Sequence, residues 1–239
     1  MKRNRWQAFN GWRSIGDVKT PILYHVDRTR DGSTYTSRSV KATQHSVPVF
    51  TMQASFKIDE QDPFHHQYKM PDVPGPEGLL NTRELYQLVL DHPEVNGANK
   101  AKVRTILADT IPLEMRPVDP KGFLHQKVGE PKQYIWMRAI GKIGDNLKVH
   151  QCVVACLSDM TMLGVATQPG GRDYKTGYMT SLDHTVWFHN PFRGDEWMLY
   201  ESECPQCGAG KALTLGRVWR QDGVLAVSLA QEGVVRSKI

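Results

Sequence analysis

A single acidic side chain stands inside a long apolar stretch in the second half of the chain. Asp159 is the only charged residue between His150 and Arg172, in a segment that predicts a buried helix, apolar on nearly every face. An ionised carboxylate in such a place costs several kcal/mol unless it is paired or hydrogen-bonded, which indicates a chemical role or a cap. The capping alternative is that Ser158 and Asp159 start a new helical turn at a break in the helix. Position alone leaves both interpretations open.

A second polar residue is predicted to point toward that helix. Between Leu225 and Gln231 the odd-numbered positions carry the larger apolar side chains and end on Gln231, whereas the even-numbered positions carry alanine and serine. Period-two alternation therefore places Gln231 on the core face of a strand. A buried amide needs a hydrogen-bond partner, and a carboxylate on the helix is the obvious candidate. A purely structural amide is the alternative.

Ser181 opens a run that also contains Asp183, His184 and His189, which invites a Ser/His/Asp interpretation. The G-x-S-x-G elbow that presents a nucleophilic serine is absent from the chain. His184 and His189 lie on opposite faces of a regular strand and cannot both serve one site. The local pattern therefore does not predict a serine nucleophile.

Four cysteines have spacings, C-x3-C and C-x2-C, that could hold zinc. They are Cys152, Cys156, Cys204 and Cys207. The first pair lies in the apolar helical segment, where reduced cysteines behave as small hydrophobic side chains. We therefore expect neither a metal nor a disulfide here. The pair His65-His66, in a proline-rich stretch, is expected to be solvated.

The elements that must position these residues form an α+β unit over residues 131–239. The predicted elements are a strand at 133–143, a helix at 150–167, strands at 180–188 and 196–203, and a hairpin of 213–221 with 224–235. The hairpin turns at Asp222-Gly223, a strong turn signal. One long helix beside an antiparallel sheet implies a sheet wrapped around that helix.

The first part of the chain predicts a related but smaller unit. Residues 1–57 read as an incomplete unit with strands at 22–26, 35–44 and 49–56, and residues 58–130 read as a proline-rich linker with short helices at 82–90 and 100–107. A shift of 176 residues superposes Leu23-Tyr24, Gly32 and Ala54 on identical residues of the second unit. This favours an internal repeat, with chance similarity between two β meanders as the alternative.

Composition narrows the possible ligands. Thirty Lys and Arg against 25 Asp and Glu give a net charge of +5, which favours phosphate-bearing ligands. Basic residues neither form blocks nor alternate with aromatic residues, so nucleic acid is not expected. The basic N-terminus lacks the apolar region of a secretory signal, and we expect no membrane span because no apolar run approaches roughly 20 residues.

Several longer runs carry a family resemblance. They are LSD at 157–159, SLDHTVWFH at 181–189, PFR at 191–193, WRQDGVLAV at 219–227 and AQEGVVR at 230–236, with DRTRDG at 27–32 and MQASF at 52–56 upstream. In these runs the chain resembles the type II acyl-CoA thioesterases, in particular the peroxisomal members of animals, over residues 16–239. The resemblance implies a double hot-dog fold of class α+β, in which each of two repeats wraps an antiparallel sheet around a helix.

The resemblance also implies a site. Asp159, Ser181 and Gln231 match the positions that hold and activate the water that hydrolyses fatty acyl-CoA to free fatty acid and coenzyme A. The family carries Ser or Thr at the middle position. No cofactor is implied, because coenzyme A is part of the substrate, and the sequence does not identify the residues that contact it.

The departure from the family lies at the N-terminus. Family members carry a strand, a Gly-Gly-Gln segment and a complete helix before the stretch that matches 14–17, where this chain has only residues 1–13. We therefore expect a first repeat without its helix, and a homo-oligomer. The missing helix motivates an alternative function, a truncated and weakly active or inactive acyl-CoA-binding form. A hot-dog hydratase is disfavoured because His150 lies nine residues from Asp159.

The last three residues suggest a location. Ser237-Lys238-Ile239 differs in one residue from the S-K-L tripeptide that directs proteins to peroxisomes. We expect a peroxisomal matrix protein, with a cytoplasmic protein as the alternative.

Overall fold

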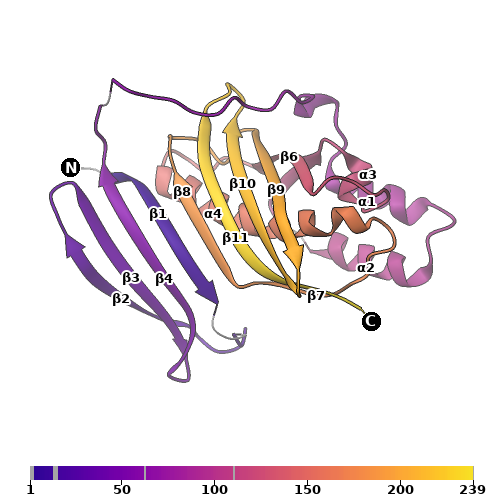
Figure 1. Ribbon diagram of the computed structural model, residues 1–239, viewed down its shortest axis with the longest axis horizontal. Helices are drawn as coiled ribbons and strands as arrows, with labels where there is room; N and C mark the ends of the chain where they lie inside the picture. Colours follow the sequence, from indigo (N-terminus) through magenta and orange to yellow (C-terminus); the bar gives the residue numbers. More distant parts are fainter. Residues whose placement is uncertain (1–2, 13–15, 62, 110, 239) are drawn as a thin grey trace.

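The computed structural model describes residues 3–12, 16–61, 63–109 and 111–238, and residues 3–12 as a backbone strand alone (Figure 1). Ser14 and Ile15 of the family-like stretch, and Ile239 of the terminal tripeptide, lie outside the described residues.

One sheet of eleven antiparallel strands organises the molecule. Its order is β2-β3-β4-β1-β8-β11-β10-β9-β6-β5, and β7 pairs with the end of β11 (Figure 1). The strands of the N-terminal half are β1 (Arg3–Trp12), β2 (Leu23–Asp31), β3 (Tyr35–Gln44) and β4 (Val47–Ile58). Those of the C-terminal half are β5 (Leu113–Pro117), β6 (Lys132–Ala139), β7 (Thr176–Ser181), β8 (Asp183–Phe188), β9 (Met198–Gly208), β10 (Lys211–Arg220) and β11 (Leu225–Ser237).

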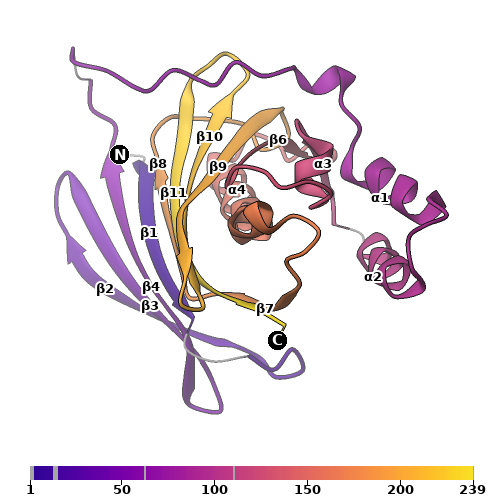
Figure 2. The same cartoon turned by 45° about the vertical axis from the view of Figure 1, so that its right-hand side comes forward.

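The helices belong to the C-terminal half and to the segment before it. They are the 3-10 turn η1 (Pro76–Gly78), α1 (Thr82–Asp91), α2 (Gly97–Ala108), α3 (Pro120–Phe123), α4 (Leu147–Met162) and the 3-10 helix η2 (Leu163–Gly170). The helix predicted at 150–167 is thus an α-helix that changes to 3-10 geometry at Leu163. Figure 2 shows α4 inside the curl formed by β8, β11, β10, β9 and β6.

Polar contacts fix where α4 begins, and apolar packing holds it in the sheet. The Asn146 side chain caps the helix by accepting a hydrogen bond from the Lys148 N–H, 3.1 Å. The buried His150 ring contacts the Gly144 carbonyl at 2.8 Å and accepts from the Gly194 N–H at 2.9 Å. Along the inner face of α4, buried side chains pack against β8, β9, β10 and β11. They include Val154, Leu157 and Met162.

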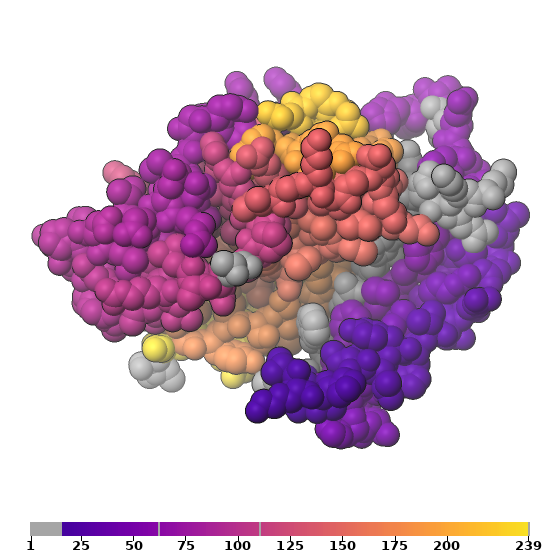
Figure 3. Space-filling model, turned by 180° about the vertical axis from the view of Figure 1, so that it is seen from behind, coloured from indigo at the N-terminus to yellow at the C-terminus, as the bar shows by residue number. Residues whose placement is uncertain are grey.

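The opposite face of α4 is open, which corrects the prediction of a buried helix. Val149 and Met160 are 41% and 40% exposed, and Cys152 and Cys156 are exposed as well. In Figure 3 the segment that contains α4 reaches the surface between the helical hairpin α1–α2 and the N-terminal strands. Sequence periodicity missed this because the exposed positions are also apolar.

The apolar character of this helix affects the membrane prediction too. The sequence analysis expected no apolar run of roughly 20 residues. By length and composition, however, the helical segment Leu147–Gly170 could cross a bilayer. Half of its most apolar window is buried inside the molecule. Core helices of soluble proteins pass the same test, so the absence of a membrane span stays a prediction.

The strands reproduce the internal repeat. Shifting β3 by 176 residues gives the bounds of β10, and the same shift places β2 on β9 and β4 on β11. The hairpins β2–β3–β4 and β9–β10–β11 pair in the same order, and β1 lies beside β4 as β8 lies beside β11. The two halves meet where β1 pairs with β8, for example at Ala8 and Val186.

Two strands were missed at the sequence level. No element was assigned to residues 1–13, yet β1 lies between β4 and β8 and joins the halves of the sheet. Inside the stretch predicted as a linker, β5 pairs with β6 and forms the sheet edge. Both strands depend on partners far away in the sequence, which local patterns do not reveal.

Residues 67–79 of the predicted linker pack on the outer face of the C-terminal half, whereas residues 127–129 lie beside η2. The indole N–H of Trp136 donates to the Pro74 carbonyl, 2.8 Å, and the Gln67 side chain accepts from the Leu225 N–H, 3.0 Å. The predicted short helices correspond to α1 and α2. The whole is the α+β double hot-dog arrangement, and among the described residues only the C-terminal half contains a helix in its curl (Figure 2).

Candidate active site

Asp159 lies in the last turn of α4, where it is half-buried. A carboxylate in this turn opposes the helix dipole, so its position does not favour helix stability. The capping alternative is wrong, because α4 continues unbroken through Ser158 and Asp159. The 3-10 helix η2 begins only after Met162 and has no side-chain cap. Asp159 instead accepts, at Oδ1, hydrogen bonds from the Ser181 hydroxyl, 2.9 Å, and from the Gln231 amide.

Gln231 points inward from β11, as strand alternation predicts, and is completely buried. Its Nε2 group donates to Asp159 Oδ1 and to Ser181 Oγ, the latter at 2.7 Å. Both amide hydrogens are therefore used within the cluster. Its Oε1 atom has no partner among the described residues.

Ser181 reaches the cluster because the strand that carries it is broken. The prediction of one strand over 180–188 is wrong, since β7 ends at Ser181 and β8 begins at Asp183. From Ala230↔Thr185 to Gly233↔Ser181, β11 advances three residues while its partner advances four. This extra residue is a β-bulge, a feature common beside active sites.

The bulge decides which way Ser181 faces. In an unbroken strand Ser181 would lie on the face opposite His184, because the two positions differ by an odd number of residues. With the extra residue, Ser181 lies beside Gly233 and turns toward Gln231, two residues along β11. Asp183 stabilises the bulge by accepting a hydrogen bond from the Glu232 N–H, 3.0 Å.

The structure thus brings together all three residues singled out in the sequence. They come from α4, the end of β7 and β11, and share two acceptor atoms, Asp159 Oδ1 and Ser181 Oγ. No described residue donates a hydrogen bond to Asp159 Oδ2. One carboxylate oxygen is held in place while the other remains available to a water molecule.

Behind Asp159 lies a buried polar layer that sequence reasoning did not connect with the site. Ser158 is fully buried, and its hydroxyl lies 2.9 Å from His184 Nε2. The Tyr200 hydroxyl donates to the Ser158 carbonyl, 3.1 Å. Burial, followed by the negative charge of Asp159, raises the pKa of Tyr200 well above its usual value, so the phenol stays protonated. The one residue of this buried polar layer that the sequence analysis had noted is His184, in the run that begins at Ser181.

Other candidate ligands lie apart from the cluster. His189, which follows the last residue of β8, contacts Ser228, 2.8 Å. All four cysteines are free, Cys204 is buried, and Cys152 and Cys156 are exposed rather than buried. Within the described part of the chain no three His, Cys, Asp or Glu residues are grouped to hold a metal. His65 and His66 are exposed.

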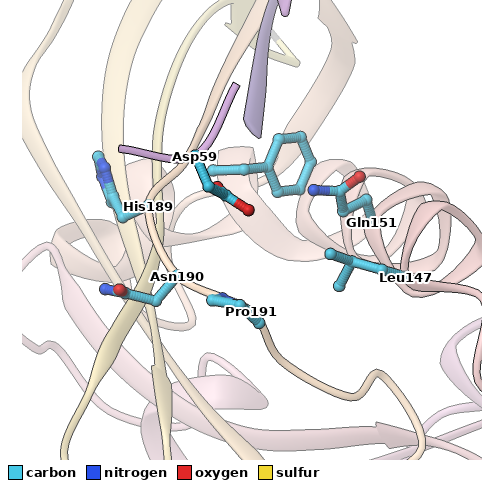
Figure 4. A pocket seen from close by; sticks show the side chains of 7 residues that line it. Asp59, Leu147, Gln151, His189, Asn190 and Pro191 are labelled. Atoms are coloured by element: carbon cyan, nitrogen blue, oxygen red, sulfur yellow. The ribbon is translucent and has the colours of Figure 1, made fainter. Parts of the chain in front are cut away.

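Two surface cavities lie toward the opposite end of α4. The smaller, of about 10 Å³, is lined by Asp59, Leu147, Gln151 and the segment 188–191 (Figure 4). Gln151 precedes Asp159 by eight residues, or about 12 Å along a helix. The larger, of about 170 Å³, includes Arg193, Trp197 and Arg220. Neither contains a residue of the cluster.

The chain is similar to known acyl-CoA thioesterases. Residues 106–234 match the family described as acyl-CoA thioesterase. The chain is 48% identical to human acyl-coenzyme A thioesterase 8 over 224 residues, which cover 93% of this chain and 70% of that protein. It is 24% identical to the peroxisomal acyl-coenzyme A thioester hydrolase 1 of Saccharomyces cerevisiae, over 92% of this chain and 76% of that protein.

A solved structure extends the likeness to three dimensions. The acyl-CoA thioesterase II TesB2 of Mycobacterium marinum superposes with a TM-score of 0.78 at 30% identity, over 99% of this chain and 82% of that one. The family match, the human relative and this shared fold lead to one conclusion: the chain belongs to the type II acyl-CoA thioesterase family and is an enzyme that hydrolyses acyl-CoA thioesters.

Proposed function

We propose that hydrolysis is carried out by a water molecule activated by Asp159, with Ser181 and Gln231 holding that carboxylate. The observation that carries the proposal is the convergence of the three side chains, with Ser181 Oγ 2.9 Å from Asp159 Oδ1 and 2.7 Å from Gln231 Nε2. A fatty acyl-CoA is the proposed substrate. The scheme needs no cofactor, because coenzyme A belongs to the substrate.

In this scheme Asp159 Oδ2 accepts a proton from water as the water oxygen attacks the thioester carbonyl carbon. The carbon–sulfur bond of the tetrahedral intermediate then breaks, and the coenzyme A thiolate leaves and takes up the proton held by Asp159, which returns the carboxylate to its starting state. Gln231 has a different role from the one expected from the sequence. Since both its amide hydrogens are directed at Asp159 and Ser181, it orients these groups rather than holding the water.

The test is Asp159→Asn, measured as free thiol release from acyl-CoAs of different chain length. We expect turnover to fall at least about a hundredfold, because the base is removed, while binding of acyl-CoA stays within about tenfold. Asp173→Asn, an exposed aspartate beyond η2, is the matched control and should behave like the unchanged protein. Near-full turnover by Asp159→Asn would remove this residue from the mechanism.

Ser181 can be tested by a pair of variants. Ser181→Ala removes a donor to Asp159 and an acceptor for Gln231 and should lower kcat about tenfold or more. Ser181→Thr keeps the hydroxyl and should retain most of the activity. If the two variants behaved alike, the hydroxyl would have no part in the reaction.

We also propose that the protein self-associates and that it is located in the peroxisomal matrix. Self-association is supported by the exposed apolar side chains of β2 and α4. The location is supported by the tripeptide 237–239 and by the name of the yeast relative.

The location is tested with the chain tagged at its N-terminus. It should colocalise at least in part with a peroxisomal matrix marker, because isoleucine retains a branched apolar side chain in the place of leucine. Deletion of residues 237–239 should disperse the signal. A wholly cytosolic distribution of the intact chain would reject the assignment.

A further inference from the structure

His184 is a buried histidine that the proposed reaction does not use. It lies on β8 directly behind the helical turn that carries Asp159 and is only 5% exposed. Its Nε2 atom is 2.9 Å from the hydroxyl of Ser158, the residue that precedes Asp159 in the chain. Its Nδ1 atom is buried and has no partner among the described residues.

The hydrogen bonds of Ser158 determine which ring nitrogen carries the proton. The Ser158 hydroxyl has one hydrogen, and its oxygen lies 3.0 Å from the Ala155 carbonyl, which can only accept. Both contacts of the hydroxyl are satisfied if Ser158 donates to Ala155 and His184 Nε2–H donates to Ser158. In the neutral ring, Nδ1 is then an unprotonated nitrogen inside the protein.

We propose that His184 is a positioning residue for Asp159, which in its neutral form holds the Ser158–Asp159 turn through the Ser158 hydroxyl. This inference rests on the proposed function of Asp159. Tyr200 holds the same turn from β9 through the Ser158 carbonyl. The bond from His184 fixes the side chain of Ser158, and the bond from Tyr200 fixes its main chain. Together they determine the direction of the neighbouring Asp159 carboxylate.

The charge of the His184 ring depends on its burial and on two nearby carboxylates. The charged groups that act on the His184 ring are Asp159 on α4 and Asp183 on its own strand. The adjacent strands contribute no titratable group where they pair with β8: β1 at Asn10, and β11 at Leu229 and Ala230. Burial lowers the pKa of His184, and the two carboxylates oppose this only in part. The ring is therefore neutral at neutral pH and places no positive charge beside Asp159.

Acid should reverse both effects. Protonation places a hydrogen on Nδ1, which has no acceptor among the described residues, and disturbs the turn. It also places a positive charge near the Asp159 carboxylate. The ionisation of His184 thus contributes to the loss of activity at low pH.

The kinetic test compares three variants over a range of pH. His184→Gln keeps an N–H group near Ser158 but cannot ionise, and should retain kcat within about threefold above neutral pH with KM unchanged. The acid limb of its pH profile should fall less steeply, because the ionisation at position 184 is removed. His184→Phe keeps a ring without the N–H and should lose about tenfold or more of kcat at every pH.

His189→Gln is the matched control, since it changes a histidine that directly follows the same strand and also contacts a serine, Ser228. It should keep the acid limb of the unchanged protein. Coincident profiles of His184→Gln and the unchanged protein, or full kcat in His184→Phe, would overturn the inference.

An NMR measurement separates this inference from the proposed function. In the unchanged protein the ¹⁵N signals of His184 should report the neutral Nε2–H tautomer at pH 7. In Asp159→Asn the ionisation of His184 should move to lower pH, because a carboxylate that favours the charged ring is lost. This readout does not depend on turnover. An Nδ1–H tautomer, or an ionisation unmoved by Asp159→Asn, would overturn the coupling even if Asp159 is the base.

Discussion

The buried amide of Gln231 shows how one residue can serve both stability and activity. Gln231 donates to Asp159 Oδ1 and Ser181 Oγ from a fully buried position. Replacing it leaves both acceptors short of a donor and leaves a cavity where the side chain was. Removing one partner of a buried hydrogen bond costs about 1–3 kcal/mol.

We therefore predict that Gln231→Ala lowers the free energy of unfolding by about 1–3 kcal/mol and also lowers kcat. Denaturant unfolding and thiol-release kinetics on the same preparation would measure both. Gln221→Ala, in the exposed turn of the same hairpin, is the control and should stay within about 0.5 kcal/mol. A Gln231→Ala protein as stable and active as this control would contradict the assigned role.

At the residue scale the sequence revealed two members of the site better than the third. Asp159 was conspicuous as a lone charge in an apolar segment, and Gln231 as a polar residue in an apolar strand face. Ser181 could be placed by family resemblance only, because regular alternation turns it away from the core. The bulge between β7 and β8 depends on pairing with β11, a strand more than forty residues further along the chain.

At the scale of elements, close packing sets the position of the helix end that carries Asp159. Gly233 on β11 lies under Leu163, the first residue of η2, so that a Cβ atom at this position would approach Leu163 Cδ1 to 2.4 Å. It would also lie 2.9 Å from the Thr180 carbonyl oxygen, next to Ser181. The glycine allows η2 and the end of β7 to approach the strand that carries Gln231.

We predict that Gly233→Ala costs about 1–3 kcal/mol of stability and lowers kcat, because the overpacked side chain must push Leu163 and the end of α4 away. Thermal unfolding and kinetics would show both effects. Gly223→Ala is not a suitable control, since Gly223 has a φ of +84° in the hairpin turn. Gly164→Ala, where no atom lies within 4 Å of the added Cβ, should be tolerated. Equal effects at 233 and 164 would reject the packing argument.

The elements that local patterns could identify were those with local signals. The hairpin of β10 and β11 follows from Asp222-Gly223, and α4 from its apolar run. The strands β1 and β5 were missed because each is stabilised by neighbours distant in the sequence, β4 and β8 for the first and β6 for the second. Which face of α4 is covered could not be predicted either, since both faces are apolar.

At the scale of the whole molecule, the two halves of the sheet differ in what covers them. The C-terminal half curls around α4, whereas the edge strand β2 of the N-terminal half is exposed along its length (Figure 2). Leu23, Tyr24 and Val26 are 62%, 63% and 62% exposed. An exposed edge strand with apolar side chains is a ready template for association with another chain.

We therefore predict that the purified protein self-associates in a concentration-dependent manner, measured by sedimentation velocity. Tyr24→Lys combined with Val26→Lys places two charges on one face of the edge strand and should shift the distribution toward the monomer. The matched control is Leu88→Lys with Ile106→Lys, which changes two exposed apolar residues on α1 and α2, 57% and 47% exposed. If the control pair dissolved the assemblies as well, the edge strand would not be the surface responsible. If the unchanged protein were a stable monomer at every concentration, self-association would be contradicted. The exposed apolar side chains of β2 would then stay in contact with water and would not drive association.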